Sequence, residues 1–439
     1  MIYYNISNPA EKADFRTATL EGQPRGGGLY FPSQIPKWEK EFVDSLPTLP
    51  KAEIGFRIMQ PFVGESLTDA ALFDIVEEVL AFEFPLRKID AENWCLELFH
   101  GPTLAFKDLG ARFLSRVMGE FAAAGGQKII VLVATSGDTG GAVADAFHGV
   151  AGTEVVILYP SGKVSPVQEK QLTTHGDNIH ALEVQGDFDD CQRLVKEAFK
   201  DEELKKGILL TSSNSINISR WLSQQIYYAI GLSQWREADK PVIAVPSGNF
   251  GNLCAGLVAQ QSGLPVQHFI AACNANRVFP NYLESGQYLP VSSVSTISNA
   301  MDVGDPSNFT RIKELFNGRE VELKENISSF SISDMLTRKT IRMAANELDY
   351  VMDPHTAVAY AALEEWKTKN GKKPGIILGT AHPVKFPEVV EEEIQKKITL
   401  PEALFSIMQK VKYAELISPD YQILRDKIAT LKKSISSTS

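Results

Sequence analysis

Basic charge and long apolar runs are both scarce in this chain of 439 residues. Its 44 Lys and Arg residues are outnumbered by 54 Asp and Glu residues, which gives a formal net charge of −10. Nucleic-acid binders usually carry a basic face, so this balance argues against a nucleic-acid partner. The longest apolar runs, such as Ile129 to Ala134, are as long as a strand and too short to span a membrane. We therefore expect neither a nucleic-acid nor a membrane partner.

Cysteine and metal-binding motifs are equally sparse. The four cysteines are scattered without a Cys-x-x-Cys pair, so we predict no zinc ribbon and no disulfide framework, but thiols in a reducing compartment. HExxH, EF-hand and GxxxxGKS/T motifs are missing, and the seven histidines have no ligand spacing, so no metal is expected. The opening "MIYYNISNPAEKADF" has neither the basic nor the apolar region of a signal peptide, which favours a cytoplasmic protein.

The middle of the sequence repeats one plan, in which a short β-branched run is followed by a turn of small residues and then by a helical pattern. "KIIVLVATSGDTGGAVADAF" and "PVIAVPSGNFGNLCAGLVAQ" are two such units. Strands that are apolar on both faces and alternate with helices predict an α/β fold with parallel sheets covered on each side. Ser165 with Gln168, and Asp187 before "FDDCQRLVKEAF", are typical helix N-caps.

The length of the chain predicts more than one domain. Residues 1–90 carry mixed signals and form a separate N-terminal segment, and we place two α/β domains at 91–235 and 236–400, between which the chain can cross. Residues 401–439 have the pattern of polar amphipathic helices, ending in the tail "SISSTS", which we expect to be disordered.

Three strand-to-helix turns are rich in glycine and small polar residues, and in parallel α/β sheets ligands bind at such turns. "PSGNFGN", from Pro246 to Asn252, could cradle a phosphate dianion, because Gly248 and Gly251 let the main chain curl closely around it. The plain alternative is a turn that only changes direction. The motif is not GxGxxG, so a dinucleotide-binding dehydrogenase is a poor match.

The second turn, "ATSGDTGG", offers hydroxyls and a helix N-terminus to a small anion such as a substrate carboxylate. Asp138 would repel such an anion, so it should face a hydroxyl or a backbone donor, unless Asp138 and Thr139 are simple helix caps. The third turn, "GIILGTAHPVKF", places Thr380 at a strand end. Its hydroxyl could meet a ring nitrogen without adding charge, although such a threonine is usually a turn former.

Lys107 in "HGPTLAFKD" opens a helical pattern that places Leu109, Phe113 and Val117 on one face. A lysine at such a position is more often a solvated surface residue. After "HGPTLAF", however, it could point into an apolar pocket, where desolvation favours the neutral amine that forms imines. One lysine, a phosphate cradle and an uncharged partner for a ring nitrogen would together make a pyridoxal phosphate site.

Seven motifs in order, "HGPTLAFKD", "TSGDTGGA", "YPSGKVSPVQEKQL", "NSINISRW", "PSGNFGN", "DVGDPSNF" and "LGTAHPVKF", closely resemble the longer threonine synthases of bacteria and fungi. The resemblance spans about Gly26 to Phe386 and extends to "GGGLYFP", where Arg25-Gly26 replaces a commonly acidic position. It implies a fold-type II pyridoxal phosphate enzyme, tryptophan synthase β-like, with the cofactor between two α/β domains.

The resemblance also implies roles for individual residues. Lys107 would form the Schiff base, Thr380 would face the pyridine nitrogen, and Asp138 would meet the ring hydroxyl or order its loop. The cofactor phosphate would be held by Gly248, Asn249, Phe250, Gly251 and Asn252, and the substrate carboxylate by Thr135, Ser136 and Thr139. Because phosphate recognition usually recruits Lys or Arg, Lys163 and Arg220 are candidates for binding the substrate phosphate.

The implied activity is that of a carbon–oxygen lyase in the last step of threonine biosynthesis. O-phospho-L-homoserine and water would give L-threonine and inorganic phosphate, and the enzyme would be a monomer or a homodimer. One alternative is a phospholyase that releases a 2-oxo acid, ammonia and phosphate, because the cofactor motifs would be shared. A minor alternative is a non-catalytic homologue that binds pyridoxal phosphate.

Overall fold

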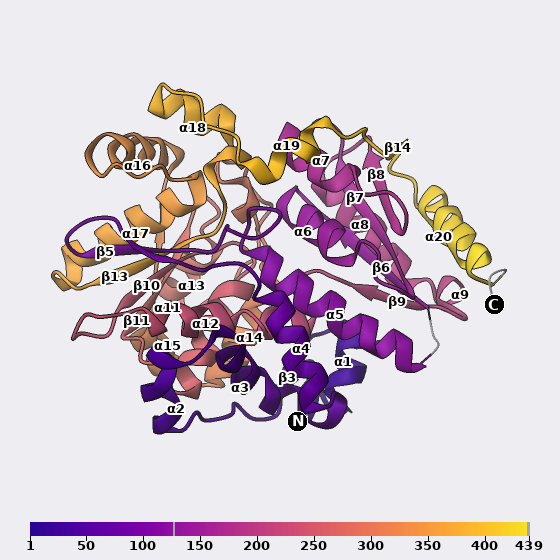
Figure 1. Cartoon of the computed structure of the whole chain (residues 1–439), viewed down its shortest axis with the longest axis horizontal. Helices are drawn as coiled ribbons and strands as arrows, with labels where there is room; N and C mark the ends of the chain where they lie inside the picture. The colour runs from indigo at the N-terminus through magenta and orange to yellow at the C-terminus, as the bar shows by residue number, and fades with distance from the viewer. Residues whose placement is uncertain (126–127, 437–439) are drawn as a thin grey trace. The chain divides into compact units, whose positions relative to one another are not determined.

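The chain folds into two compact units, each assembled from stretches that are distant in sequence (Figure 1). The computed structural model describes residues 1–125 and 128–436. Unit 1 contains Met1, Phe31–Phe106 and Trp221–Thr399, and unit 2 contains Ile2–Tyr30, Lys107–Arg220 and the chain from Leu400 onward. These units differ from the linear division at 90/91 and 235/236, because residues 31–106 and 221–399 share one sheet and its helices.

Unit 1 is built on a six-stranded sheet with the order β12-β11-β10-β13-β5-β4. All neighbouring strands are parallel except the edge pair β4 and β5. The strands are β4 (Leu86–Lys88), β5 (Asn93–Glu97), β10 (Val242–Pro246), β11 (His268–Cys273), β12 (Ile327–Ser331) and β13 (Gly375–Gly379).

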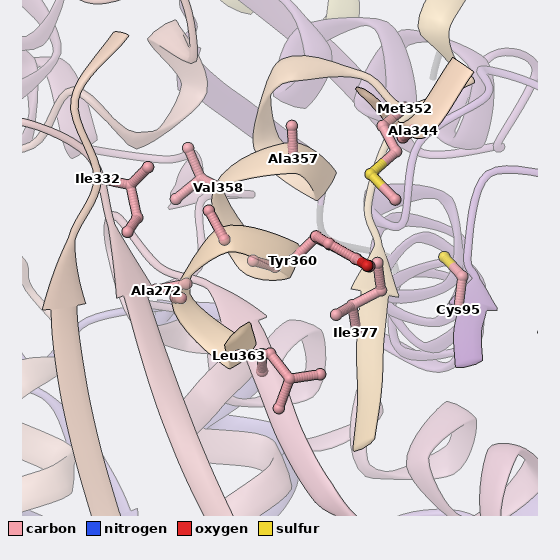
Figure 2. Close-up of a cluster of buried hydrophobic side chains, with 14 of the residues drawn as sticks. Cys95, Ala272, Ile332, Ala344, Met352, Ala357, Val358, Tyr360, Leu363 and Ile377 are labelled. Atoms are coloured by element: carbon pink, nitrogen blue, oxygen red, sulfur yellow. The ribbon is translucent and has the colours of Figure 1, made fainter. Parts of the chain in front are cut away.

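Helices cover this sheet, and α17 packs on four of its strands. Figure 2 shows Val358 and Leu363 of α17 gathered with Ala272 of β11 and Ile377 of β13 in the buried core of the unit. The helices are α2 (Lys40–Ser45), η1 (Leu46–Thr48), α3 (Lys51–Val63), η2 (Gly64–Ser66), α4 (Asp69–Val79), α11 (Gln225–Ser233), α12 (Gly251–Ser262), α13 (Val278–Ser285), η3 (Asn299–Met301), α14 (Phe309–Phe316), α15 (Glu320–Asn326), α16 (Asp334–Glu347), α17 (Pro354–Asn370), η4 (Pro383–Lys385) and α18 (Pro387–Ile394).

Unit 2 is built on a five-stranded parallel sheet with the order β14-β8-β7-β6-β9. Residues of β6 alternate between two cores: Val131 packs into one on one face, and Leu132 into the other. The predicted parallel sheet, apolar on both faces, is therefore confirmed. The strands of this sheet are β6 (Ile129–Ala134), β7 (Thr153–Pro160), β8 (Ile179–Val184), β9 (Leu209–Ser212) and β14 (Ala414–Ile417). A separate three-stranded sheet has the order β2-β1-β3, in which β1 (Tyr3–Asn5) pairs antiparallel with β2 (Asn8–Ala13).

Two helices of unit 2 begin where the sequence predicts. Ser165 and Gln168 form a capping box at the start of α7, and Asp187 caps α8. The helices are α1 (Phe15–Glu21), α5 (Lys107–Gly125), α6 (Asp138–Phe147), α7 (Pro166–Thr173), α8 (Phe188–Lys200), α9 (Glu202–Lys205), α19 (Glu402–Gln409) and α20 (Tyr421–Ser436), while β3 (Tyr30–Pro32) and α10 (Ile218–Leu222) lie where the chain changes unit. Because α20 reaches Ser436, the first half of the expected disordered tail is helical, and residues 437–439 lie outside the described residues.

Membrane-spanning helices, metal sites and disulfides were not expected, and each was sought in the described part of the chain. There, no helix is both long and apolar enough to cross a membrane, and no group of His, Cys, Asp or Glu side chains could hold a metal ion. All four cysteines lie in the described residues, where they are buried and unbridged.

Candidate active site

Lys107 is the first residue of α5 and is mostly buried, with only 16% of its side chain exposed. Its Nζ lies 3.6 Å from Oδ2 of Asp138, the first residue of α6, whose side chain is 3% exposed. A solvated surface lysine would not be held against a buried carboxylate, so the surface interpretation of Lys107 is wrong. Leu109, Phe113 and Val117 are fully buried, as the helical pattern predicts.

Asp138 has a second partner that the sequence did not indicate. Its Oδ1 accepts a hydrogen bond of 2.9 Å from Nε2 of Gln168, which is buried on α7. We expected a hydroxyl or a backbone donor at Asp138, and the partners that the structure places there include the Gln168 side-chain amide and the Lys107 ammonium. The capping box identifies Gln168 from sequence, but nothing local shows that its amide also reaches Asp138.

Gly137 makes this arrangement possible. It is the N-cap of α6 with φ +138°, a region that side chains disfavour. A Cβ at this position would also lie 2.6 Å from Cδ of Gln168. Gly137 therefore serves both the turn and the close approach of the Gln168 amide.

The Thr135 hydroxyl organises the turn between β6 and α6. Its buried Oγ1 accepts hydrogen bonds from the backbone N–H groups of Gly137 at 3.0 Å and Gly140 at 2.9 Å. Ser136 and Thr139, in contrast, are half-buried. Two of the three predicted carboxylate ligands are thus accessible at the helix N-terminus, while Thr135 folds the loop and keeps only its own O–H to donate.

The two candidates for the substrate phosphate lie in very different surroundings. Arg220 is buried and its Nη1 donates to the carbonyl of Ser213. Burial lowers the pKa of Arg220 to about 10, and the nearby carboxylate of Asp108, the residue after Lys107, acts in the opposite direction. Lys163, on the turn between β7 and α7, is exposed.

In unit 1, the "PSGNFGN" turn joins β10 to α12. An ideal Cβ on Gly248 would lie 2.6 Å from the Cα of Met301, so only glycine allows the two backbones to approach this closely. Phe250, the N-cap of α12, has φ +59°, and the centroid of its ring lies 4.9 Å from that of the Phe279 ring. The turn is thus a strained, tightly backed loop rather than a simple change of direction.

The amides of this loop have contrasting partners. Two hydrogen bonds hold Asn249 in place. Its Oδ1 accepts from the N–H of Ser307 at 2.7 Å, and its backbone carbonyl accepts from Nδ2 of Asn308 at 3.0 Å. Asn252 accepts from the hydroxyls of Tyr227 at 2.7 Å and Tyr228 at 2.6 Å through Oδ1. Its Nδ2 is buried and finds no acceptor among the described residues.

Thr380 follows β13 and is buried beside the segment that leads to Lys107. Its carbonyl accepts from the N–H of Phe106 at 2.9 Å, and Ala105 and Ala381 form an antiparallel bridge. Leu104, with φ +59°, lets the chain turn into this pairing. Unit 1 thereby fixes the residue that directly precedes Lys107 in the chain.

The residues of the loop fit a phosphate-bearing cofactor. Buried polar groups are nearly always hydrogen-bonded, and the orphaned Nδ2 of Asn252 at the start of α12 is a donor that calls for an acceptor. The backbone N–H groups of a helix N-terminus attract the same anion. An anion-binding loop, a sequestered lysine and parallel α/β sheets are features of pyridoxal phosphate enzymes. The family model described as "Pyridoxal-phosphate dependent enzyme" matches residues 83–379 of the chain.

Comparison with known proteins narrows the class to one family. The models described as "Threonine synthase N terminus" and "Threonine synthase, C-terminal" match residues 2–80 and 356–428. The chain is 47% identical over 406 residues to a threonine synthase of Serratia marcescens, and this alignment covers 92% of the chain and 93% of that protein. The chain belongs to the threonine synthase family of pyridoxal phosphate dependent lyases.

Solved structures agree with this assignment. The crystal structure of threonine synthase from Escherichia coli matches with a TM-score of 0.91 and 42% identity, over 98% of this chain and all of that one. A threonine synthase from Brucella melitensis with bound pyridoxal phosphate matches with a TM-score of 0.92 and 34% identity, over 98% of both chains. The predicted fold class and cofactor are thus confirmed.

Proposed function

We propose that this chain converts O-phospho-L-homoserine and water into L-threonine and inorganic phosphate, with Lys107 as its catalytic residue. The observation that carries the proposal is the sequestration of Lys107, whose Nζ lies 3.6 Å from the buried carboxylate of Asp138. Family membership supports the reaction, and this contact supports the assignment of the lysine.

Lys107 has two tasks in this proposal. At rest, its Nζ would hold the cofactor covalently. When bound, pyridoxal phosphate delocalises negative charge from the carbon atoms of an amino-acid substrate. When free, the Nζ would take protons from Cα and Cβ of the substrate and return protons to Cγ, after phosphate leaves it, and to Cα, after water adds at Cβ. Asp138 holds the ammonium in place between these transfers, and Gln168 fixes Asp138.

The loop at residues 248–252 and Thr380 would make the remaining cofactor contacts. Residues 248–252 would receive the cofactor phosphate on the backbone N–H groups of the loop and on Nδ2 of Asn252. Thr380 would present an uncharged hydroxyl to the pyridine nitrogen. An uncharged partner does not hold that nitrogen protonated, so it moderates charge withdrawal by the ring and favours elimination.

The substrate would be bound through its two anionic groups. Ser136 and Thr139 would hold its carboxylate, helped by the positive end of α6 and by the O–H of Thr135. Arg220 or Lys163 would bind its phosphate. The buried Arg220 is the better placed of the two to act away from bulk water, where charge-assisted hydrogen bonds are stronger.

Borohydride trapping tests this assignment. Reduction of the holoenzyme should leave a pyridoxyl group on the peptide that contains Lys107, as mass mapping would show. Lys107→Ala should lose the label and the activity, whereas the control Lys196→Ala, on the exposed side of α8, should keep both. A label on another lysine would refute the central claim.

Product analysis separates the proposed reaction from the phospholyase alternative. With O-phospho-L-homoserine, the holoenzyme should release equal amounts of threonine and phosphate. A 2-oxo acid and ammonia in place of threonine would identify a phospholyase, and the absence of any turnover would favour a non-catalytic homologue. We also propose a monomer or homodimer in the cytoplasm, which light scattering and cell fractionation would test.

A further inference from the structure

The motif "DVGDPSNF", Asp302 to Phe309, has no part in the proposed chemistry, yet its segment lies directly behind the loop at residues 248–252. Just before the motif, Met301 in η3 leaves no room for a Cβ on Gly248, which would lie 2.6 Å from the Met301 Cα. Further along, Ser307 and Asn308 donate hydrogen bonds to Asn249. The segment thus meets the loop at both ends.

Asp302 fixes the first of these ends. Its Oδ1 accepts hydrogen bonds from Nδ2 of Asn274 at 2.8 Å, Nδ2 of Asn276 at 3.0 Å and Oγ1 of Thr296 at 2.7 Å. Its Oδ2 accepts from the N–H of Thr296 at 2.9 Å. Four donors on one carboxylate hold the backbone next to Met301 in a single position.

His355 fixes η3 from another direction. Its Nδ1 lies 2.6 Å from Oδ2 of Asp353, and its Nε2 accepts from the N–H of Ala300 at 3.2 Å. Both side chains are buried at the start of α17. Because the Nδ1–H of His355 donates to Asp353, Nε2 is the nitrogen that accepts from the N–H of Ala300.

The end at Asn308 is equally constrained. Asn308 and Arg311 are buried, and Nη1 of Arg311 donates to Oδ1 of Asn308 at 2.6 Å. This bond orients the Asn308 amide so that its Nδ2 points to the carbonyl of Asn249. Between the two ends, Gly304 passes so close to Val291 that a Cβ would lie 1.8 Å from its carbonyl oxygen.

We propose that residues 299–308 are a rigid template for the cofactor-phosphate loop, and that Asp302 and His355 are positioning residues that act through it. The inference rests on the proposed role of residues 248–252 as the phosphate site. A loop that is shaped before the ligand arrives does not lose binding energy in ordering itself. The template should therefore favour the phosphate-bearing cofactor and leave the binding of its ring unaffected.

Binding of two cofactor forms to the full-length apoenzyme tests the template. Dissociation constants would be measured by absorbance for pyridoxal phosphate and for pyridoxal, which lacks the phosphate. Asp302→Asn should weaken binding of pyridoxal phosphate by about tenfold or more, as expected when hydrogen bonds that hold the loop are lost, and leave pyridoxal within about twofold. Asp305→Asn is the matched control in the same motif. Asp305 is exposed and accepts a hydrogen bond only from Tyr288 among the described residues, so this substitution should change neither dissociation constant.

A second pair of variants covers the case in which Asp302→Asn does not fold. His355→Leu removes the acceptor of the Ala300 N–H and should weaken pyridoxal phosphate selectively, whereas His355→Gln keeps an acceptor and should recover most of the affinity. The melting temperature of each apoenzyme would be recorded in parallel. An equal loss of affinity for both cofactor forms would indicate a general structural role and overturn the proposal.

Asn252→Ala separates failure of the template from failure of the phosphate assignment. If Asn252→Ala leaves the affinity for pyridoxal phosphate unchanged, residues 248–252 are not the phosphate site and both ideas fall. If it weakens that affinity while Asp302→Asn and His355→Leu do not, the phosphate site stands and the template is wrong.

Discussion

The side-chain amide of Gln168 joins the N-termini of α7 and α6 by donating from Nε2 to Oδ1 of Asp138 at 2.9 Å. Its Oε1 simultaneously accepts from the N–H of Ser165 at 3.1 Å, so the amide cannot turn without losing both bonds. The other oxygen of Asp138 faces Lys107. A helix-capping residue thus sets the direction of the carboxylate that holds the proposed catalytic lysine.

Gln168→Glu should impair this arrangement more than a simple loss of packing would. The new carboxylate would face Asp138 in a buried site, which destabilises the fold by roughly 1–3 kcal/mol and displaces Asp138 from Lys107. We expect kcat/KM to fall at least about tenfold with a lower Tm. Gln192→Glu, on α8, is the control and should change neither; an unaltered kcat/KM in Gln168→Glu would contradict the role of the amide.

Gly137→Ala should be far more harmful than alanine at another glycine with positive φ. The strained backbone alone costs about 1–2 kcal/mol, and the contact of 2.6 Å with Gln168 adds overpacking of roughly 1–3 kcal/mol. Gly149 has φ +74° with no atom within 4 Å of its ideal Cβ, so Gly149→Ala tests a positive φ without a close contact. Thermal unfolding and kcat/KM should separate the two variants, and equal losses would show that the contact does not matter.

Thr380→Asp should change the products more than the binding of substrate. A carboxylate would hold the pyridine nitrogen protonated and strengthen charge withdrawal by the ring, which favours side reactions. We expect the ratio of threonine to 2-oxo acid to fall by about tenfold or more, corresponding to over 1.4 kcal/mol between competing barriers. Thr380→Ser keeps the hydroxyl and should keep the ratio; an unchanged ratio in Thr380→Asp would remove the argument for an uncharged partner.

His382 should make the protein sensitive to acid. Burial lowers the pKa of His382 to about 4, below its ordinary value of 6.5, and its Nδ1 accepts from the N–H of Val384 at 3.1 Å. Between these two pKa values the unfolded chain binds more protons, so stability is complete above pH 6.5 and is lost as the pH falls toward 4. His382→Asn keeps an acceptor for the N–H of Val384 but removes the group that titrates.

The loss attributable to His382 between pH 7 and pH 5 is roughly 1–2 kcal/mol, or a few degrees of Tm. Thermal scans of the holoenzyme at both pH values should therefore show a smaller decrease in Tm for His382→Asn than for the wild type. Parallel decreases in the two proteins would assign the acid sensitivity to other groups.

Replacing Arg220 and replacing Lys163 should have different effects on stability and on phosphate binding. Arg220→Ala takes a buried cation away from Asp108 and should destabilise the protein by about 3–5 kcal/mol in addition to weakening inhibition by inorganic phosphate. Lys163→Ala, at an exposed position, should leave Tm unchanged and raise KM only if Lys163 binds the substrate phosphate. Wild-type KM and kcat in both variants would exclude both residues from this role.

The alternation of apolar strands with helices was enough to predict the parallel sheets, because a strand that is apolar on both faces must be covered on both. The capping residues at Ser165 and Asp187 were predictable for a similar reason, since a cap depends on groups only three residues away. The discontinuous units were not, because the sequence pattern does not say which strands share a sheet.

By itself, the sequence determined the parallel α/β fold, the family, and the turns that carry the candidate chemistry. Only the tertiary structure decided that Lys107 is sequestered against Asp138, that Gln168 reaches Asp138 from 30 residues away, and that Met301 backs Gly248. The physical reason is range. Periodicity and capping act within a few residues of the chain, whereas burial, orphaned donors and close backbone contacts arise only when distant segments fold together.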